Sequence, residues 1–151
     1  MTKRVRPDWI TYFMDGAQWA SSRSIDPNTQ VGCIIADARS RLVSSGYNSF
    51  PAGVDDSFWP TTKESIEVEP GLFVNKYQIV QHAEANAIAA ANGSLVGCDL
   101  YVTHHPCNDC AKLIATAGIS RVYYKNYRDK DESKIAALIL KQAKIALIQT
   151  K

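Results

Sequence analysis

The sequence predicts an α/β protein with three layers, in which helices cover both faces of a central mixed five-stranded sheet. Segments with helical and strand patterns alternate from residue 82 to residue 149, as they do in α/β folds. Nearer the N-terminus, two strand-like segments are separated by a tight turn, which is typical of a hairpin. At 151 residues the chain can bury a sizeable core, and we expect residues 1–151 to form one domain.

The N-terminal third predicts one helix and one hairpin. Asp8 is suited to cap a helix over residues 9–20, where apolar residues recur at helical spacing at Trp9, Phe13, Ala17 and Ala20. The turn-rich stretch 26–30 leads into a strand near residues 31–36. A short connection at residues 39–40 then leads into the second hairpin strand at residues 42–45.

Residues 48–81 form the least regular part of the sequence. They are polar, rich in proline, glycine and aspartate, and show no clean period. Connections of this length are uncommon in compact domains and usually carry function. We therefore interpret residues 48–81 as an inserted loop region with a functional role.

The second half of the chain predicts the alternating elements. A helix over residues 82–91 stops at Asn92-Gly93, and a strand follows at residues 99–103. The next helix, over residues 107–117, ends at Gly118, a residue suited to close a helix. A strand at residues 119–124, a helix at residues 132–143 and a strand at residues 144–149 complete the series.

Composition excludes several classes of protein. Apolar residues make up 46% of the chain and charged residues 21%, as in ordinary globular proteins. A net charge of +2 is too small to indicate a general nucleic-acid surface. No apolar run approaches the ~20 residues that span a bilayer, and the basic residues 1–7 lack the apolar stretch of a signal peptide. We expect no membrane partner and a cytoplasmic location, in the host cytoplasm if the chain is viral.

Two short motifs carry the candidate chemistry, His82-Ala83-Glu84 and Pro106-Cys107-Asn108-Asp109-Cys110. One imidazole and two thiols suit a catalytic zinc ion with three protein ligands and a fourth position open to water. Glu84, two residues past His82, is placed to handle protons without being a ligand. The pattern H-x-E…P-C-x-x-C is the signature of zinc deaminases.

Both motifs fall at expected helix starts. Free amide groups and partial positive charge at a helix N-terminus favour thiolates at Cys107 and Cys110, and their i, i+3 spacing puts both sulfurs on one side. At ~3.6 residues per turn, Glu84 lies about 200° around a helix from His82. We therefore expect an irregular helix start, or a Glu84 side chain that reaches past the metal, with Glu84 as a proton carrier.

A closed structural zinc site and a redox pair are the alternatives for the two thiols. A closed site needs a fourth ligand, for which the remaining candidates are Cys33, Cys98, His104 and His105. The two cysteines lie in or beside apolar runs and are expected to be small buried side chains. The two histidines are expected at a strand end near the pocket, outside the site itself.

Beyond these motifs, the sequence resembles the deoxycytidylate (dCMP) deaminases, a branch of the zinc-dependent cytidine and deoxycytidylate deaminase family. The D-P-N-x-Q-V-G stretch at residues 26–32 and the G-Y-N stretch at residues 46–48 are more specific to this branch than the zinc motif. The resemblance covers nearly the whole chain, through the segments Thr11–Met14, Arg23–Gly32, Gly46–Pro51, His82–Ile88 and Pro106–Ile114.

The resemblance implies a cytidine-deaminase-like fold and a reaction that converts dCMP to dUMP, the precursor of thymidylate. It implies that Glu84 carries the protons and that the Ala83 N–H holds the carbonyl group of the base. The zinc ligands that it implies are His82, Cys107 and Cys110. One zinc ion is expected, because residues 48–81 contain no cysteine or histidine.

For the rest of the nucleotide, the resemblance assigns Asn48 to the sugar. Arg23, Ser24 and Asn28 lie in a loop that is a candidate for the 5′-phosphate, because they offer charge and polar groups. A plain turn with a solvated Arg23 explains the same residue types equally well.

Members of this branch are typically homohexamers that dCTP activates and dTTP inhibits. The resemblance places their effector site at a G-Y-N-G turn, here Gly46, Tyr47 and Asn48, with Ser49 in place of the last glycine. Asp55, Asp56 and Lys76 in the insertion are candidates to line that site or to bind Mg²⁺ beside an effector triphosphate. Simple solvation is the alternative for Asp55. Trp9, Trp19 and Trp59 offer apolar surface for assembly.

Three other functions remain open on the sequence. A deaminase of tRNA or single-stranded nucleic acid should show a basic surface interleaved with aromatic residues, which a net charge of +2 does not favour. Free cytidine is a second possible substrate. A catalytically silent regulator that binds zinc and senses nucleotides is the third, and the intact Glu84 argues against it.

Overall fold

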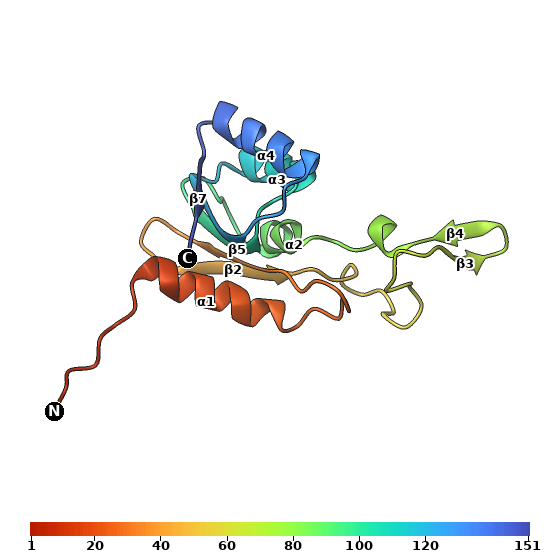
Figure 1. Cartoon of the computed structure of the whole chain (residues 1–151), viewed down its shortest axis with the longest axis horizontal. Coiled ribbons are helices and arrows are strands. Elements are labelled where there is room, and N and C mark those ends of the chain that lie inside the picture. The colour runs from red at the N-terminus through yellow and green to blue at the C-terminus, as the bar shows by residue number, and fades with distance from the viewer.

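The computed structural model describes residues 1–151 and confirms the predicted fold class. A central sheet has the strand order β2-β1-β5-β6-β7 (Figure 1). The strand β1 is antiparallel to β2 and to β5, whereas β5, β6 and β7 are parallel, so the sheet is mixed. The strands are β1 (Gly32–Ala36), β2 (Leu42–Tyr47), β5 (Asp99–His104), β6 (Arg121–Asn126) and β7 (Ala146–Gln149).

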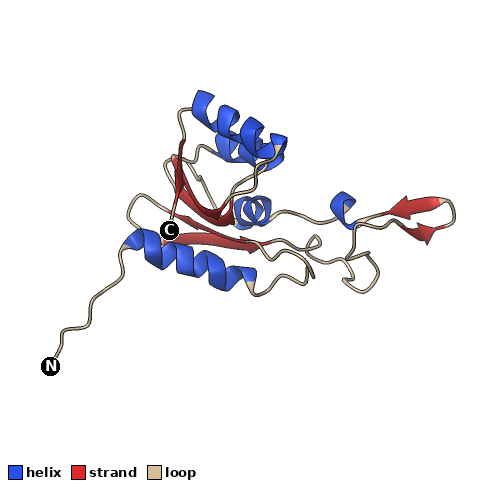
Figure 2. Cartoon of the chain, in the orientation of Figure 1, coloured by secondary structure: helices blue, strands red, loops and turns tan.

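Helices cover both faces of the sheet, as predicted. Helix α1 (Trp9–Ser21) lies along one face, and α2 (Ala83–Ala90), α3 (Asn108–Ala117) and α4 (Asp131–Gln142) lie on the other (Figures 1 and 2). Every predicted helix and strand is present, with ends shifted by two residues at most. None of the helices has the length and apolarity needed to cross a membrane.

Helix α1 begins where the sequence predicts, because the Thr11 amide donates to the Asp8 carboxylate at 2.8 Å. Its apolar side packs on alternate residues of the sheet, which point to the same face. This smaller core cluster consists of Phe13, Met14, Ala17, Ile34, Ala36, Tyr101 and Tyr123.

The larger core cluster lies on the opposite face, beneath α2, α3 and α4. Cys33 and Ile35 of β1 point into it, whereas Ile34 between them points toward α1. Cys33 and Cys98 are buried in this cluster, as the sequence predicts. Helix α3 ends at Gly118, also as predicted, with a left-handed backbone at φ 81°.

The insertion is more regular than its sequence pattern predicts. It contains a hairpin of β3 (Ile66–Glu69) and β4 (Leu72–Val74), followed by the 3-10 turn η1 (Lys76–Gln78). The hairpin extends away from the body of the molecule (Figure 1). Its strands are short, largely exposed and irregular in register between Glu67 and Glu69, which explains the absence of a clean period.

Candidate active site

The first ligand of each motif stands just outside its helix. His82 precedes α2 with φ −70° and ψ 155°, and Cys107 precedes α3 with φ −81° and ψ 173°. Both residues are therefore extended, and the helix begins at the next residue. This is the irregular helix start that the sequence requires, because it frees His82 from the angular spacing of the helix that contains Glu84.

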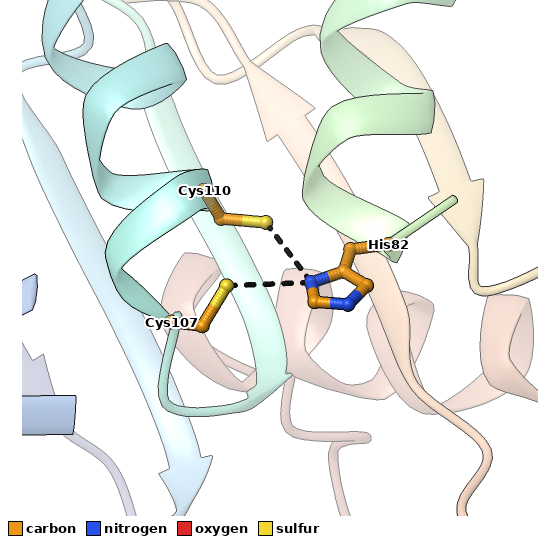
Figure 3. Close-up of side chains that lie close together, drawn as sticks. All are labelled: His82, Cys107 and Cys110. Carbon is orange, nitrogen blue, oxygen red and sulfur yellow. Dashed lines mark hydrogen bonds between the residues drawn. The ribbon is translucent and has the colours of Figure 1, made fainter. Parts of the chain in front are cut away.

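The structure brings the three predicted ligands together (Figure 3). His82 Nδ1 lies 3.4 Å from the sulfur of Cys107 and 3.4 Å from the sulfur of Cys110. All three ligand atoms lie within 4.8 Å of one another, and no fourth Cys, His or carboxylate joins the group. A tetrahedral zinc ion with bonds of ~2.3 Å to sulfur and ~2.05 Å to nitrogen needs S···N separations of about 3.6 Å. The geometry therefore fits a zinc ion with one open position.

The three ligands form a coupled acid–base group. Interactions with the Cys110 thiol, and then with His82, lower the pKa of Cys107 to about 4. Interaction with Cys107 raises the pKa of His82 to about 8. The pKa of Cys110 is raised by Cys107 and by burial. Cys107 is thus held as a thiolate, the form that binds metal, and metal binding would displace the remaining protons.

Glu84 lies beside this group but is not part of it. Its side chain is buried, and its Oε2 accepts from the Cys110 thiol at 3.6 Å. Burial raises the pKa of Glu84 above its ordinary value, because desolvation disfavours the carboxylate. A carboxyl group with a raised pKa binds a proton more readily than an ordinary carboxyl group, which suits a group that takes up and returns a proton.

His82, Glu84 and Cys107 border a cavity of about 490 Å³. The cavity lies at the end of the sheet where β5 and β6 end, which is the usual place for a ligand in an α/β protein. Its volume is in the range of small-molecule sites. Residues from six parts of the chain line it, including Asn28, Asn48, Lys76, Ala83, Glu84, His104, Asn126 and Arg128.

Asn48 is held rigidly at the cavity wall. Its Oδ1 accepts from the Val31 amide at 2.8 Å, and its Nδ2 donates to the Thr29 carbonyl at 2.9 Å. An asparagine amide has two N–H donors and two acceptor lone pairs, so one of each stays free for a ligand.

Other predicted residues lie elsewhere. Arg23 and Ser24 do not line the cavity, and the Arg23 guanidinium lies 5.7 Å from the centroid of the Tyr47 ring. Asp55 is exposed, and its carboxylate accepts from the amide and hydroxyl of Ser57. It faces neither the cavity nor another carboxylate with which it could bind a metal ion.

The G-Y-N-S stretch is explained by packing. Gly46 is buried against α2, where a Cβ atom would overlap the Ala83 carbonyl oxygen and the Ala87 nitrogen. Ser49 does not adopt a positive φ, so serine is unstrained there. The Ser49 amide donates to the Gln81 carbonyl at 3.1 Å, and the Gln81 amide donates to the Ser49 carbonyl at 2.7 Å. This bridge closes the insertion just before His82.

The sequence pattern missed the residues at the end of β6 and just after it. Asn126, Arg128 and Lys130 line the cavity opposite the turn at residues 26–30, and Arg128 donates to the Thr29 hydroxyl at 3.2 Å. One available signal was the position of N-Y-R-D-K just after a strand predicted to lie in the same sheet as the strand before Cys107. Carboxyl ends of parallel neighbours meet at one edge of a sheet. His104 and His105, expected near the pocket, also line the cavity.

Comparison with known proteins agrees with this geometry. Residues 7–126 match the family model described as the cytidine and deoxycytidylate deaminase zinc-binding region. A protein of Drosophila melanogaster named "Probable deoxycytidylate deaminase" is 47% identical over 81% of this chain and 62% of its own length. The human deoxycytidylate deaminase is 40% identical over 90% of this chain and 76% of its own length.

Solved structures show the same fold. The dCMP deaminase of cyanophage S-TIM5, in complex with dCMP and dUMP, is 27% identical and has a TM-score of 0.74. The match covers 97% of this chain and 100% of the phage chain. Shared sequence along most of the chain, the shared fold and the His/Cys/Cys cluster point to one family. The chain belongs to the cytidine and deoxycytidylate deaminases of the zinc-binding type.

Proposed function

We propose that the protein deaminates dCMP to dUMP and ammonia and so supplies dUMP for thymidylate synthesis, in the cytoplasm. The observation that carries this proposal is the placement of His82, Cys107 and Cys110 beside the buried Glu84, at the wall of a cavity of about 490 Å³. The names of the relatives support dCMP as the substrate. The complex of the phage relative with dCMP and dUMP supports the same choice.

His82, Cys107 and Cys110 would hold a zinc ion. When bound, a zinc ion would act as a Lewis acid and lower the pKa of a water molecule to about 7. Glu84 then carries protons on the open side of the site. Its carboxylate takes a proton from water and delivers it to the ring nitrogen of cytosine, while the water oxygen adds to the carbon that bears the amine. Glu84 then takes the second proton from that oxygen and gives it to the amine, so that the C–N bond breaks, ammonia leaves and a carbonyl group remains.

Two groups are suited to orient the base and the sugar. The Ala83 N–H lies in the first turn of α2, where amides have no partner within the helix, so it is suited to donate to the carbonyl of the base. The Asn48 amide keeps one N–H and one lone pair free, which suits a sugar hydroxyl that can both accept and donate.

Arg128 is our candidate for the 5′-phosphate, with Asn28 across the cavity. A guanidinium can donate two parallel hydrogen bonds to a phosphate, which makes it the stronger partner for this group. Arg23 and Ser24 also stay proposals for the 5′-phosphate, with less support than Arg128, because neither lines the cavity.

Effector control and assembly complete the proposal. The resemblance to dCMP deaminases favours activation by dCTP, with Mg²⁺ beside the triphosphate, and inhibition by dTTP. It also favours a homohexamer. Light scattering on the purified protein would then give six times the 16.7 kDa mass of the chain, and a monomer mass would contradict the assembly.

One assay tests the proposed reaction. Ammonia release by the zinc-loaded protein is measured with dCMP, deoxycytidine and an RNA stem-loop, each with and without dCTP or dTTP. We expect turnover of dCMP, far less of deoxycytidine, and none of RNA. Equal rates on deoxycytidine and dCMP would indicate a nucleoside deaminase. Activity on RNA alone would indicate a nucleic-acid deaminase. No ammonia release from any of the three would indicate a regulator.

A further inference from the structure

One ion pair differs from all others in this molecule. Lys76 Nζ lies 2.9 Å from Asp26 Oδ2, and the two side chains are only 8% and 10% exposed. Each of the remaining ion pairs has at least one side chain that is more than half exposed. A buried pair contributes little net stability, because desolvation of both charges offsets their attraction. Stability alone is therefore a weak explanation for this pair.

The pair joins two segments that lie 50 residues apart in the sequence. Lys76 begins the turn η1 at the end of the insertion, and its amide donates to the Thr62 carbonyl at 3.2 Å. Asp26 begins the turn at residues 26–30. Its second carboxylate oxygen accepts from the amides of Asn28 and Thr29, at 2.9 Å and 3.0 Å. Asp26 thus binds the insertion with one oxygen and shapes its own turn with the other.

The far side of this turn holds two cavity residues in place. The Thr29 carbonyl accepts from Asn48 Nδ2 at 2.9 Å, and the Thr29 hydroxyl accepts from Arg128 Nη2 at 3.2 Å. Asn48 comes from the end of β2 and Arg128 from the segment after β6. A continuous chain of contacts therefore runs from Lys76 through Asp26 and Thr29 to both side chains.

We propose that the Asp26–Lys76 ion pair is a positioning device, which fixes the turn at residues 26–30 and through it the Asn48 and Arg128 side chains that receive the nucleotide. This inference rests on the proposed function for the identity of the nucleotide. Lys76 acts through Asp26, because its ammonium is already engaged there, and it makes no hydrogen bond or ion pair with the zinc ligands or Glu84. The pair controls substrate affinity, whereas Glu84 controls turnover.

Three variants test the proposal, each measured for KM and kcat on dCMP and for zinc content. They are Lys76→Met, Asp26→Asn and the double variant Asp26→Asn/Lys76→Met. Asparagine keeps an oxygen for the Asn28 and Thr29 amides, but it replaces the oxygen that faces Lys76 with an uncharged NH2 group that cannot accept from the ammonium. We expect each single variant to raise KM about 10-fold or more with kcat within about 3-fold of the wild type. The double variant should be no worse than the worse single variant, because the two residues act as one unit.

Arg41→Met is the matched control. It removes a pair of similar length, Arg41 to Asp37 at 3.0 Å, in which the Arg41 side chain is exposed and neither residue lines the cavity. We expect its KM to be unchanged. If a single variant fails to fold because a lone charge is buried, the double variant still tests the proposal, since it buries no charge.

Different failures lead to different conclusions. An unchanged KM in folded Lys76→Met and Asp26→Asn would overturn the proposal. A raised KM in Lys76→Met with an unchanged KM in Asp26→Asn would also overturn the proposal, because Lys76 would then contact the substrate directly.

Amide hydrogen exchange provides a readout that does not depend on activity. Asn28 and Thr29 should exchange faster in Lys76→Met than in the wild type, and equal protection would overturn the proposal. Failure of the wild type to act on dCMP would refute the proposed function and leave this readout valid.

Discussion

Glu84 has its chemical role because of where the helix begins. His82 is extended and stands outside α2, so the Glu84 side chain can approach the ligand group without entering it. Burial raises the pKa of its carboxyl, which suits a group that must accept and return a proton in one catalytic cycle. The separate roles of His82 and Glu84 thus depend on the extended backbone of His82 just before the helix.

Glu84→Gln tests the proton role. Glutamine has nearly the same shape but cannot carry a proton, so turnover should fall about 10²- to 10⁴-fold. The zinc content should stay at one ion per chain, because Glu84 is outside the ligand group. Steady-state kinetics and metal analysis measure both quantities. Glu69→Gln, in the exposed hairpin, is the control. Retention of activity by Glu84→Gln would assign the proton transfers to another group.

Cys107→Ala tests the ligand role. Removing one of three ligands should cost the metal as well as the activity, because no other Cys, His or carboxylate lies in the group to replace it. Cys98→Ala is the control, since Cys98 is a free cysteine that is buried in the core cluster and lies outside the ligand group. We expect Cys98→Ala to keep its zinc. A normal zinc content in Cys107→Ala would contradict the ligand assignment.

His104 gives the protein a predicted sensitivity to acid. Burial, and secondarily the charge of Arg128, lower the pKa of His104 below its ordinary 6.5. Below pH 6.5 the unfolded chain therefore binds a proton that the folded chain does not, and stability falls as the pH is lowered toward the folded pKa. In His104→Gln this contribution is absent, so urea midpoints between pH 7 and pH 5 should fall less than in the wild type. Equal slopes would show that His104 titrates normally.

At the scale of elements, the packing of β2 on α2 sets the position of the site. Gly46 lets the two backbones approach closely, and the Ser44 hydroxyl donates to the Ala87 carbonyl across the same contact. Helix α2 begins at Ala83, so any displacement of this helix also moves the Ala83 amide and Glu84. The resemblance assigns Gly46 to an effector turn, and its packing alone already requires glycine.

Gly46→Ala should therefore damage stability and catalysis together. The added methyl group meets backbone atoms of α2, which cannot rotate away as a side chain can. We expect a loss of about 3 kcal/mol in the free energy of unfolding, at the upper end of typical overpacking, with a lower kcat. Urea unfolding and kinetics measure these changes. Gly16→Ala is the control, because its methyl group would lie 3.3 Å from Ile34 Cγ1, a side-chain atom that can shift. The higher helix propensity of alanine offsets this contact, so the free energy of unfolding should fall by about 1 kcal/mol or less.

Local signals predicted the elements well. Asp8 and Gly118 mark real helix ends, and the alternation of Cys33, Ile34 and Ile35 between the two core clusters follows from strand geometry. The zinc motif predicted that the His82 and Cys107/Cys110 side chains lie close together, because both halves of the motif fall at helix starts. These features depend on residues that are close in sequence or on a motif of known spacing.

Distant contacts were not predictable in the same way. Arg128 reaches Thr29 across 99 residues, and Lys76 reaches Asp26 across 50 residues. No periodicity records such contacts, because they depend on which sheet edges meet and on how the insertion folds back. The hairpin in residues 66–74 was missed because its exposed strands need no apolar alternation.

At the scale of the whole molecule, the body and the hairpin differ in what holds them. The body has two core clusters, whereas β3 and β4 pair with each other at a distance from the sheet (Figure 1). Leu72 and Phe73 of the hairpin are more than half exposed. The return of the chain to the body rests on the Ser49–Gln81 bridge and on Lys76, both outside the hairpin.

Shortening the hairpin should therefore leave the site intact. Ile66 and Val74 are paired across the hairpin, so replacing residues 67–73 by Asn-Gly closes the strands with a favourable two-residue turn. We expect one zinc per chain, KM for dCMP within about 3-fold of the wild type and a similar melting temperature, because the removed residues touch neither core nor cavity. Light scattering on the same variant shows whether assembly needs the hairpin. If zinc or affinity for dCMP is lost while the assembly is unchanged, the hairpin must support the site within its own chain. Such a result would contradict the expectation that the site does not depend on the hairpin. The position of Lys76 and its ion pair would then depend on residues 67–73.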